Sequence, residues 1–214
     1  MKAIGRKTVS AILKTFLIIY FCLPALGGQK KASYGYSVKS ILFIGNSLTY
    51  TNDLPAMVVL LAKEKGIRLK AEVLAYPNYG LEDHWSNGNL QQLIPASQFD
   101  FVVLQQGPSS QSEGRAMLLD YGVRIKALCD TTKTRLAFFM VWPAFANLHT
   151  FEGVIKNYSD AATATNSLLC PVGAVWKKHF DETKDYSYYG PDLFHPSQKG
   201  SEIAAKVIVD ALFK

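Results

Sequence analysis

The chain has 214 residues and a formal net charge of +6, and 49% of its residues are hydrophobic and 19% charged. This length suits one domain with its own hydrophobic core, and this composition excludes a disordered chain. The charge does not indicate a nucleic-acid-binding protein, because residues 1–28 hold four of the 23 basic residues and none of the 17 acidic ones. The rest of the chain therefore carries 19 − 17 = +2 and has no run of basic residues interleaved with aromatic ones.

The first 28 residues follow the order of a secretory signal peptide. Four basic residues precede the apolar run 15–26, and two glycines follow it. The run is shorter than the roughly 20 apolar residues that span a bilayer as a helix. We therefore expect a signal peptide over 1–28, a polar segment over 29–37 and one domain over 38–214, exported to the periplasm or the medium. The membrane would then be contacted only through this segment before cleavage; an uncleaved N-terminal anchor is the alternative.

Beyond this segment, short apolar runs alternate with amphipathic stretches. The runs rich in β-forming residues are 40–44, 71–75, 99–104, 134–142 and 170–175. The amphipathic stretches are 54–65, 81–93, 112–129, 151–169 and 197–213. Strands that alternate with helices predict an α/β fold, a three-layer sandwich in which helices cover both faces of a mainly parallel, five-stranded sheet.

The cysteines and histidines do not indicate a metal site. Cys22 would leave with the signal peptide, whereas Cys129 and Cys170 would remain in a compartment that permits disulfides. Both lie in apolar surroundings, where a buried free thiol and a disulfide are equally compatible with the sequence. No pair has CxxC spacing and the four histidines lack metal-ligand spacing, so we expect no metal site.

Polar residues follow the predicted strands at the edge where ligands gather in open parallel sheets. Ser47, within Gly-Asn-Ser-Leu-Thr at 45–49, comes directly after the first strand and shortly before a helix. Gly80 ends the loop 76–80 after the second strand, and amide and hydroxyl side chains fill 105–110 after the third. A serine placed in this way presents its hydroxyl at the sheet edge, where helix amides favour negative charge.

Asp192 and His195 stand three residues apart in a loop with a proline on either side. A carboxylate at this spacing can accept a hydrogen bond from one imidazole nitrogen. The other nitrogen is then free to take a proton from a serine, which is a poor nucleophile without such a base. Each segment alone is also compatible with a simple turn, in which Asp192 and Pro196 shape the loop and the histidine is exposed. Their joint order and placement favour Ser47 as nucleophile, His195 as base and Asp192 as the group that orients it.

These residues carry a family resemblance. The segment 45–49 resembles the first conserved block of SGNH/GDSL hydrolases, with Asn46 where aspartate is common. The segment 192–196, Asp-Leu-Phe-His-Pro, resembles their last block, and Gly80 falls where the second-block glycine is expected. The resemblance covers roughly residues 41–214 and looks nearest to a bacterial branch whose first block reads Gly-Asn-Ser.

The resemblance implies a flavodoxin-like sandwich and an ester hydrolase that needs no cofactor. Ser47 would attack the ester carbonyl while His195 takes its proton and Asp192 holds the imidazole tautomer. The backbone N–H groups of Ser47 and Gly80, together with the side chain of Gln106, would form the oxyanion hole.

The third block departs from the family pattern Gly-x-Asn-Asp. Here 107–110 reads Gly-Pro-Ser-Ser, which places Ser109 at the position of the asparagine. Gln106 resembles instead the Gln-Gly-Glu-Ser pattern of some SGNH carbohydrate acetylesterases, and its amide reaches further than a serine hydroxyl. We therefore expect Gln106 as the side-chain donor, with Ser109 as the alternative.

Export suits a small-molecule or carbohydrate ester, or one of the cell envelope, with acetyl as the expected acyl group. Two alternatives remain open. An acyltransferase would use the same three residues, and an inactive glycan-binding module is supported by the departure in the third block. Tyr79, Trp85 and Trp142 are compatible with either a core position or the lining of a site. The remaining histidines, His84, His149 and His179, are expected at the surface or as caps.

Overall fold

The computed structural model describes residues 37–214. The predicted signal peptide, 1–28, lies outside the described residues, as does the polar segment 29–37 except for Ser37. The expectations about cleavage and export therefore stay predictions.

Five parallel strands form one sheet in the order β2-β1-β3-β4-β5. The strands are β1 (Lys39–Gly45), β2 (Leu69–Ala75), β3 (Phe101–Leu104), β4 (Arg135–Phe139) and β5 (Leu168–Cys170). This is the flavodoxin-like order, in which the chain winds outward in both directions from β1 and β3. The predicted α/β sandwich is confirmed.

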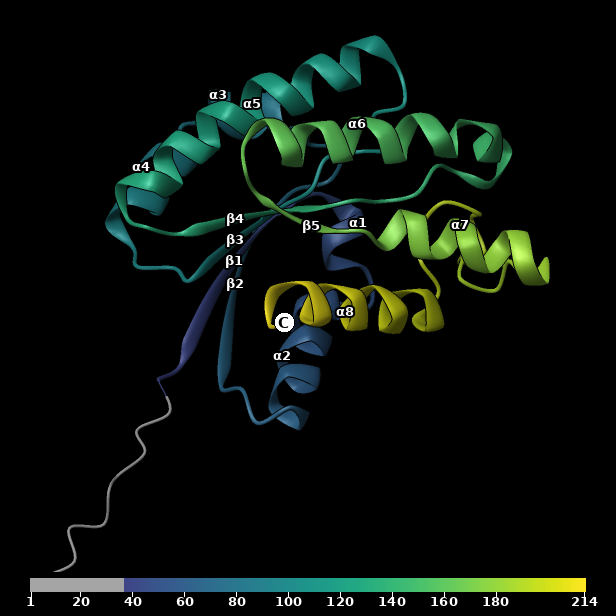
Figure 1. Ribbon diagram of the computed structural model, residues 1–214, viewed down its shortest axis with the longest axis horizontal. Helices are drawn as coiled ribbons and strands as arrows, with labels where there is room; N and C mark the ends of the chain where they lie inside the picture. Colours follow the sequence, from purple (N-terminus) through teal and green to yellow (C-terminus); the bar gives the residue numbers. More distant parts are fainter. Residues whose placement is uncertain (1–36) are drawn as a thin grey trace, which may run out of the picture. The chain divides into compact units, whose positions relative to one another are not determined.

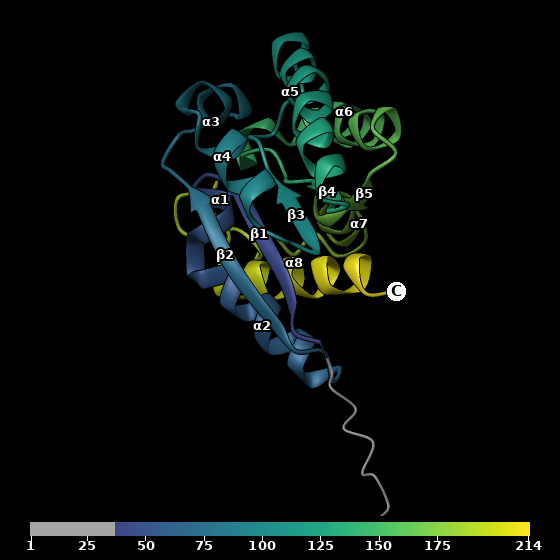
Figure 2. The ribbon, with the colours of Figure 1, turned by 90° about the vertical axis from the view of Figure 1, so that its left-hand side faces the viewer.

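Helices cover both faces of the sheet (Figure 1). On one face lie α2 (Leu54–Glu64) and α8 (Gln198–Leu212), and on the other lie α3 (Leu81–Asn87), α4 (Asn89–Ala96), α5 (Ser112–Thr131) and α6 (Phe151–Ala164). Helix α7 (Val172–Thr183) packs between α6 and α8 beside β5. The short helix α1 (Ser47–Tyr50) follows β1 at the carboxyl edge of the sheet (Figure 2). None of the helices within 37–214 combines the length and the apolar composition needed to cross a membrane.

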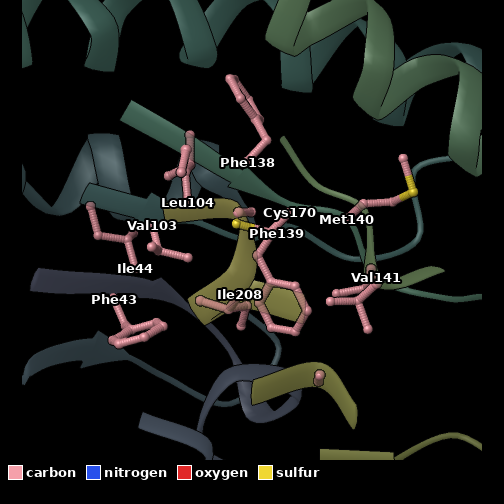
Figure 3. Packing of buried hydrophobic residues seen from close by; sticks show 14 of the residues in the cluster. Phe43, Ile44, Val103, Leu104, Phe138, Phe139, Met140, Val141, Cys170 and Ile208 are labelled. Carbon is pink, nitrogen blue, oxygen red and sulfur yellow. The ribbon is translucent and has the colours of Figure 1, made fainter. Parts of the chain in front are cut away.

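Consecutive residues of the central strands are buried on opposite faces. Figure 3 shows the neighbours Phe138 and Phe139 of β4 pointing in opposite directions, and Ile208 of α8 lies on the side of Phe139. On the other face Phe138 packs against α5 so closely that a Cβ at Gly122 would lie 2.9 Å from its ring. Burial on both faces explains why these strands appear in the sequence as continuous apolar runs.

Several predicted elements differ from the structure in their bounds; the helix expected at 151–169, for example, ends at Ala164, and α7 was not expected. The fifth strand was expected at 170–175 but lies at Leu168–Cys170, and α7 begins at Val172. Trp176 and Phe180 are buried four residues apart in α7, the spacing of a helix face rather than of a strand. The single helix expected at 81–93 is two helices, because Gly88 between them adopts φ = 83° and ends the first.

The two cysteines of the described region do not form a disulfide. Cys129 lies in α5 and Cys170 ends β5, and both are buried free thiols. Burial raises the pKa of each thiol to about 12. Both are therefore neutral, unreactive core residues, which answers the question that the sequence left open.

Candidate active site

The structure brings the three predicted residues Ser47, His195 and Asp192 together at the carboxyl edge of the sheet. Ser47 is the first residue of α1, and its Oγ lies 2.8 Å from Nε2 of His195. Nδ1 of His195 lies 2.5 Å from Oδ2 of Asp192. With Nδ1–H donating to the carboxylate, Nε2 accepts from the serine hydroxyl, the arrangement that proton transfer from serine requires.

Asp192 is held in its charged form. Its Oδ2 accepts from the imidazole, and its Oδ1 accepts the backbone N–H groups of Phe194 at 3.1 Å and His195 at 2.9 Å. The hydrogen bond from His195, joined by these two N–H groups, holds the pKa of Asp192 below its usual range. The carboxylate is therefore ionised at neutral pH and available to stabilise a protonated imidazole.

The loop that carries His195 is fixed to the loop after β4. The Nε1–H of Trp142 donates to the carbonyl of Phe194 at 3.0 Å, and the backbone N–H of Phe145 donates to that of Leu193 at 2.9 Å. Trp142 is itself buried and stacked on Trp176, with 3.6 Å between the ring centroids. The tryptophan is thus a core residue whose one polar atom holds the loop of Asp192 and His195 in place.

Asn46 shapes the turn that carries Ser47. Its Oδ1 accepts the N–H of Leu48 at 3.1 Å and so caps α1. The N–H of Ser47, at the first position of the helix, has no intrahelical partner and is available to a ligand. The Nδ2 of Asn46 donates to the carbonyl of Tyr79 at 3.0 Å and joins this turn to the loop after β2. An ionised aspartate at this position could not make that bond.

Gln105, at the end of β3, clamps the same turn from the other side. Its Oε1 accepts the N–H of Asn46 at 2.9 Å and the hydroxyl of Thr49 at 2.7 Å, so it straddles Ser47. Gly45 leaves room for this contact, because a Cβ there would lie 2.3 Å from Oε1 of Gln105 and 2.4 Å from Oγ1 of Thr49. The Nε2 of Gln105 is buried and finds no partner among the described residues. Sequence reasoning missed both Gln105 and Thr49.

His84 is buried, contrary to the expectation of a surface or capping position. It lies on α3 three residues after Leu81, and both side chains face the interior. Its Nε2 is 2.8 Å from the carbonyl of Gly45, just before the turn that carries Ser47. Burial lowers its pKa, so the ring is neutral and can donate a single N–H to this carbonyl. His84 is therefore a further support of the turn.

The predicted oxyanion donors are not equally free. The N–H of Gly80 donates to Oδ2 of Asp83, an exposed side chain that can rotate away. The Nε2 of Gln106 donates to Ser109 Oγ at 2.8 Å and to the Gly114 carbonyl at 3.1 Å. The oxyanion role predicted for Gln106 therefore requires these two bonds to open.

Ser109, the alternative donor, is engaged as well. Its hydroxyl donates to the carbonyl of Gly107 at 2.9 Å. The Oε1 of Gln106 accepts the N–H of Leu81 at 3.2 Å. This glutamine therefore joins the loop that contains the third block, residues 105–111 (the third-block loop), to the start of α3. The other three predicted donors, Gly80 N–H, Gln106 Nε2 and Ser109 Oγ, each already donate a hydrogen bond within the protein.

Comparison with known proteins supports the same fold. The chain is similar to the structure of a proposed SGNH hydrolase from Slackia heliotrinireducens, with 24% identity and a TM-score of 0.68 over 82% of this chain and 100% of that one. It is similar to a lipase/acylhydrolase from Enterococcus faecalis, with 16% identity and a TM-score of 0.65 over 81% and 94%. It is also similar to an acetylxylan esterase from Geobacillus stearothermophilus, with 17% identity and a TM-score of 0.63 over 83% and 95%.

No family model matches the sequence, and no curated protein matches it. The chain thus has the fold of SGNH hydrolases, which confirms at the level of the fold the resemblance seen in the sequence. Within 37–214 no group of three or more His, Cys, Asp or Glu side chains is placed to hold a metal ion.

Proposed function

We propose that this protein is a serine ester hydrolase in which Ser47, His195 and Asp192 form the catalytic triad. The observation that supports this most directly is the unbroken series of hydrogen bonds from Ser47 Oγ through the imidazole to the Asp192 carboxylate. Ser47 lies 148 residues before His195 in the chain, so no local turn accounts for the alignment of its hydroxyl with the His195–Asp192 pair. The similarity to hydrolase structures is consistent with the proposal.

In the proposed reaction Ser47 Oγ attacks the ester carbonyl as its proton passes to Nε2 of His195. Asp192 stabilises the imidazolium, and the N–H of Ser47 donates to the developing oxyanion. The N–H of Gly80 becomes a second donor once Asp83 releases it. The carbon–oxygen bond to the alcohol then breaks, and Nε2 returns the proton to the leaving oxygen. Water, deprotonated by His195, hydrolyses the acyl-enzyme and regenerates Ser47.

We further propose that the substrate is an acetylated carbohydrate or cell-envelope ester and that the protein acts outside the cytoplasm. The predicted signal peptide supports the location. A fold shared with an acetylxylan esterase supports the substrate class by analogy alone.

The test is hydrolysis of p-nitrophenyl acetate by the purified protein and by its Ser47→Ala variant. Deletion of a triad nucleophile typically costs about 10⁴-fold or more in kcat, with the fold intact. Ser97→Ala, which removes a hydroxyl after α4 far from the triad in sequence, is the matched control and should keep full activity. A Ser47→Ala variant that retained a tenth of wild-type turnover would show that another residue is the nucleophile.

A further inference from the structure

A cavity of about 320 Å³ lies between the third-block loop and the loop that follows β4. Pro108, Ser110 and Gln111 line it on one side, Asn147 and His149 on the other, and Phe194 closes it beside the proposed base. We call it the loop cavity. Its volume is at the lower end of the range of about 300–1,000 Å³ found for small-ligand pockets.

Phe194 connects the loop cavity to the proposed triad. Its ring packs edge-on against the imidazole of His195, with 5.1 Å between the centroids. The carbonyl of Phe194 accepts a hydrogen bond from Trp142, and Phe194 lies between Asp192 and His195 in the loop. A molecule in the loop cavity would therefore lie against the residue that adjoins the base.

The walls of the loop cavity are held in place without a ligand. On the third-block side, Nδ2 of Asn157 donates to the Ser109 carbonyl at 2.8 Å, and the hydroxyl of Tyr158 donates to that of Gly107 at 3.0 Å. On the opposite side, the hydroxyl of Tyr189 donates to the Pro143 carbonyl at 2.7 Å. Binding would therefore need little ordering of the protein, as is usual for ligand pockets.

The chemistry of the lining selects a class of ligand. The residues that line it include hydroxyls, two carboxamides and an imidazole, beside proline, alanine and the Phe194 ring, and they include no Lys, Arg, Asp or Glu. A charged ligand would find no partner of opposite charge, and an alkyl chain would desolvate the amides and hydroxyls without replacing their hydrogen bonds. A compact ligand rich in hydroxyl groups, with an apolar ring face, satisfies both kinds of surface.

We infer that the loop cavity binds the alcohol half of the ester, an uncharged sugar ring. This inference rests on the proposed triad, because His195 must return its proton to the leaving oxygen and the alcohol must therefore lie on the side of the imidazole. The acyl group would then extend toward the Ser47 N–H and the loop after β2.

The test compares two acetate esters that differ in the alcohol, an O-acetylated methyl xyloside and p-nitrophenyl acetate. Asn147→Ala and Gln111→Ala are each expected to lower kcat/KM for the sugar ester about 3- to 10-fold through KM, the effect of losing one hydrogen bond to substrate. The same variants should leave p-nitrophenyl acetate unchanged. Gln98→Ala, which removes an exposed carboxamide just before β3 at the opposite edge, is the matched control and should change neither. Equal losses on both esters, or a changed preference for butyrate over acetate, would overturn the inference.

Binding to the Ser47→Ala variant separates this inference from the proposed function. Saturation-transfer NMR with unesterified methyl xyloside should show binding that Asn147→Ala weakens about 3- to 10-fold in the same background. If the sugar does not bind while the wild type still cleaves p-nitrophenyl acetate, the inference fails and the esterase proposal stands. If the sugar binds in this way but no ester is cleaved, the esterase proposal fails and the sugar site stands.

Discussion

Replacing Thr49 with valine removes one buried hydroxyl from the clamp around the nucleophile and keeps the shape of the side chain. The hydroxyl donates to Gln105 Oε1 at 2.7 Å, and Thr49 is fully buried. Oε1 keeps its bond from the N–H of Asn46, so no acceptor is left without a donor. We expect the loss of one such bond to lower the free energy of unfolding by about 1 kcal/mol. For a chain of this size that is a fall of about 2–4 °C in Tm.

The effect on catalysis should exceed the effect on stability. Thr49 and Asn46 flank Ser47, so loosening the clamp on one side lets the turn shift. A displacement of about 1 Å in a catalytic group can cost about 10²-fold. A smaller shift of this turn should lower kcat for p-nitrophenyl acetate by about 10-fold and leave KM nearly unchanged.

Thr49→Ser is the matched variant, because it keeps the hydroxyl and loses the buried methyl group. Its loss of stability should be similar, about 1 kcal/mol. Two variants of equal stability would then differ in activity, with Thr49→Ser near wild type and Thr49→Val reduced. Equal kcat values for the two would refute the positioning role and leave Thr49 as a packing residue.

Three further predictions concern the candidate site and the predicted signal peptide. His84 is buried and neutral, and burial lowers its pKa below the ordinary value of 6.5. Below pH 6.5 the unfolded state therefore binds more protons than the folded state, so the free energy of unfolding should decrease as the pH is lowered. In urea titrations at pH 7.5 and 5 the His84→Gln variant should show a smaller fall, and an equal one would assign the effect to other groups. Asp83→Ala should lower Tm slightly by removing the cap on Gly80 N–H yet keep or raise kcat; a tenfold loss of kcat would mean that this N–H is not an oxyanion donor. The exported protein should begin near Gln29 by N-terminal sequencing, whereas intact Met1 on a membrane-bound protein would indicate an anchor.

The fold could be predicted from the sequence because its strands are buried on both faces. Phe101–Leu104 and Leu136–Phe139 appear as uninterrupted apolar runs, which amphipathic helices separate. The fifth strand was misplaced because Leu168–Cys170 is three residues long. So short a strand gives no periodicity of its own, and its leucines also continued the helical pattern of α6.

The proposed triad residues could be singled out in the sequence because each part of their signal is local. Asp192 and His195 lie within one turn of a single loop, and Ser47 directly follows a strand. Gln105 could not be recognised in this way, because its contact with Asn46 depends on the register that pairs Ile44 with Leu104 across the sheet. His84 likewise depends on how α3 is rotated against β1.

Gln106 illustrates the limit of reasoning from side-chain chemistry. Its amide has the reach and donor strength that an oxyanion hole needs, which is why the sequence favoured it over Ser109. In the folded chain its amide group contacts Ser109 three residues on, Gly114 in α5 and Leu81 in α3, and these contacts depend on how the loop folds back onto the two helices. The donor set of the oxyanion hole therefore stays a prediction.

The central claim is that Ser47 is a nucleophile activated by His195, and covalent labelling tests it most directly. A fluorophosphonate reacts with an activated serine by forming an oxygen–phosphorus bond and releasing fluoride. Peptide mass spectrometry should then find the adduct on Ser47 alone, and the His195→Ala variant should label far more slowly. An adduct on another serine, or Ser47 labelling at the same rate without His195, would contradict the account.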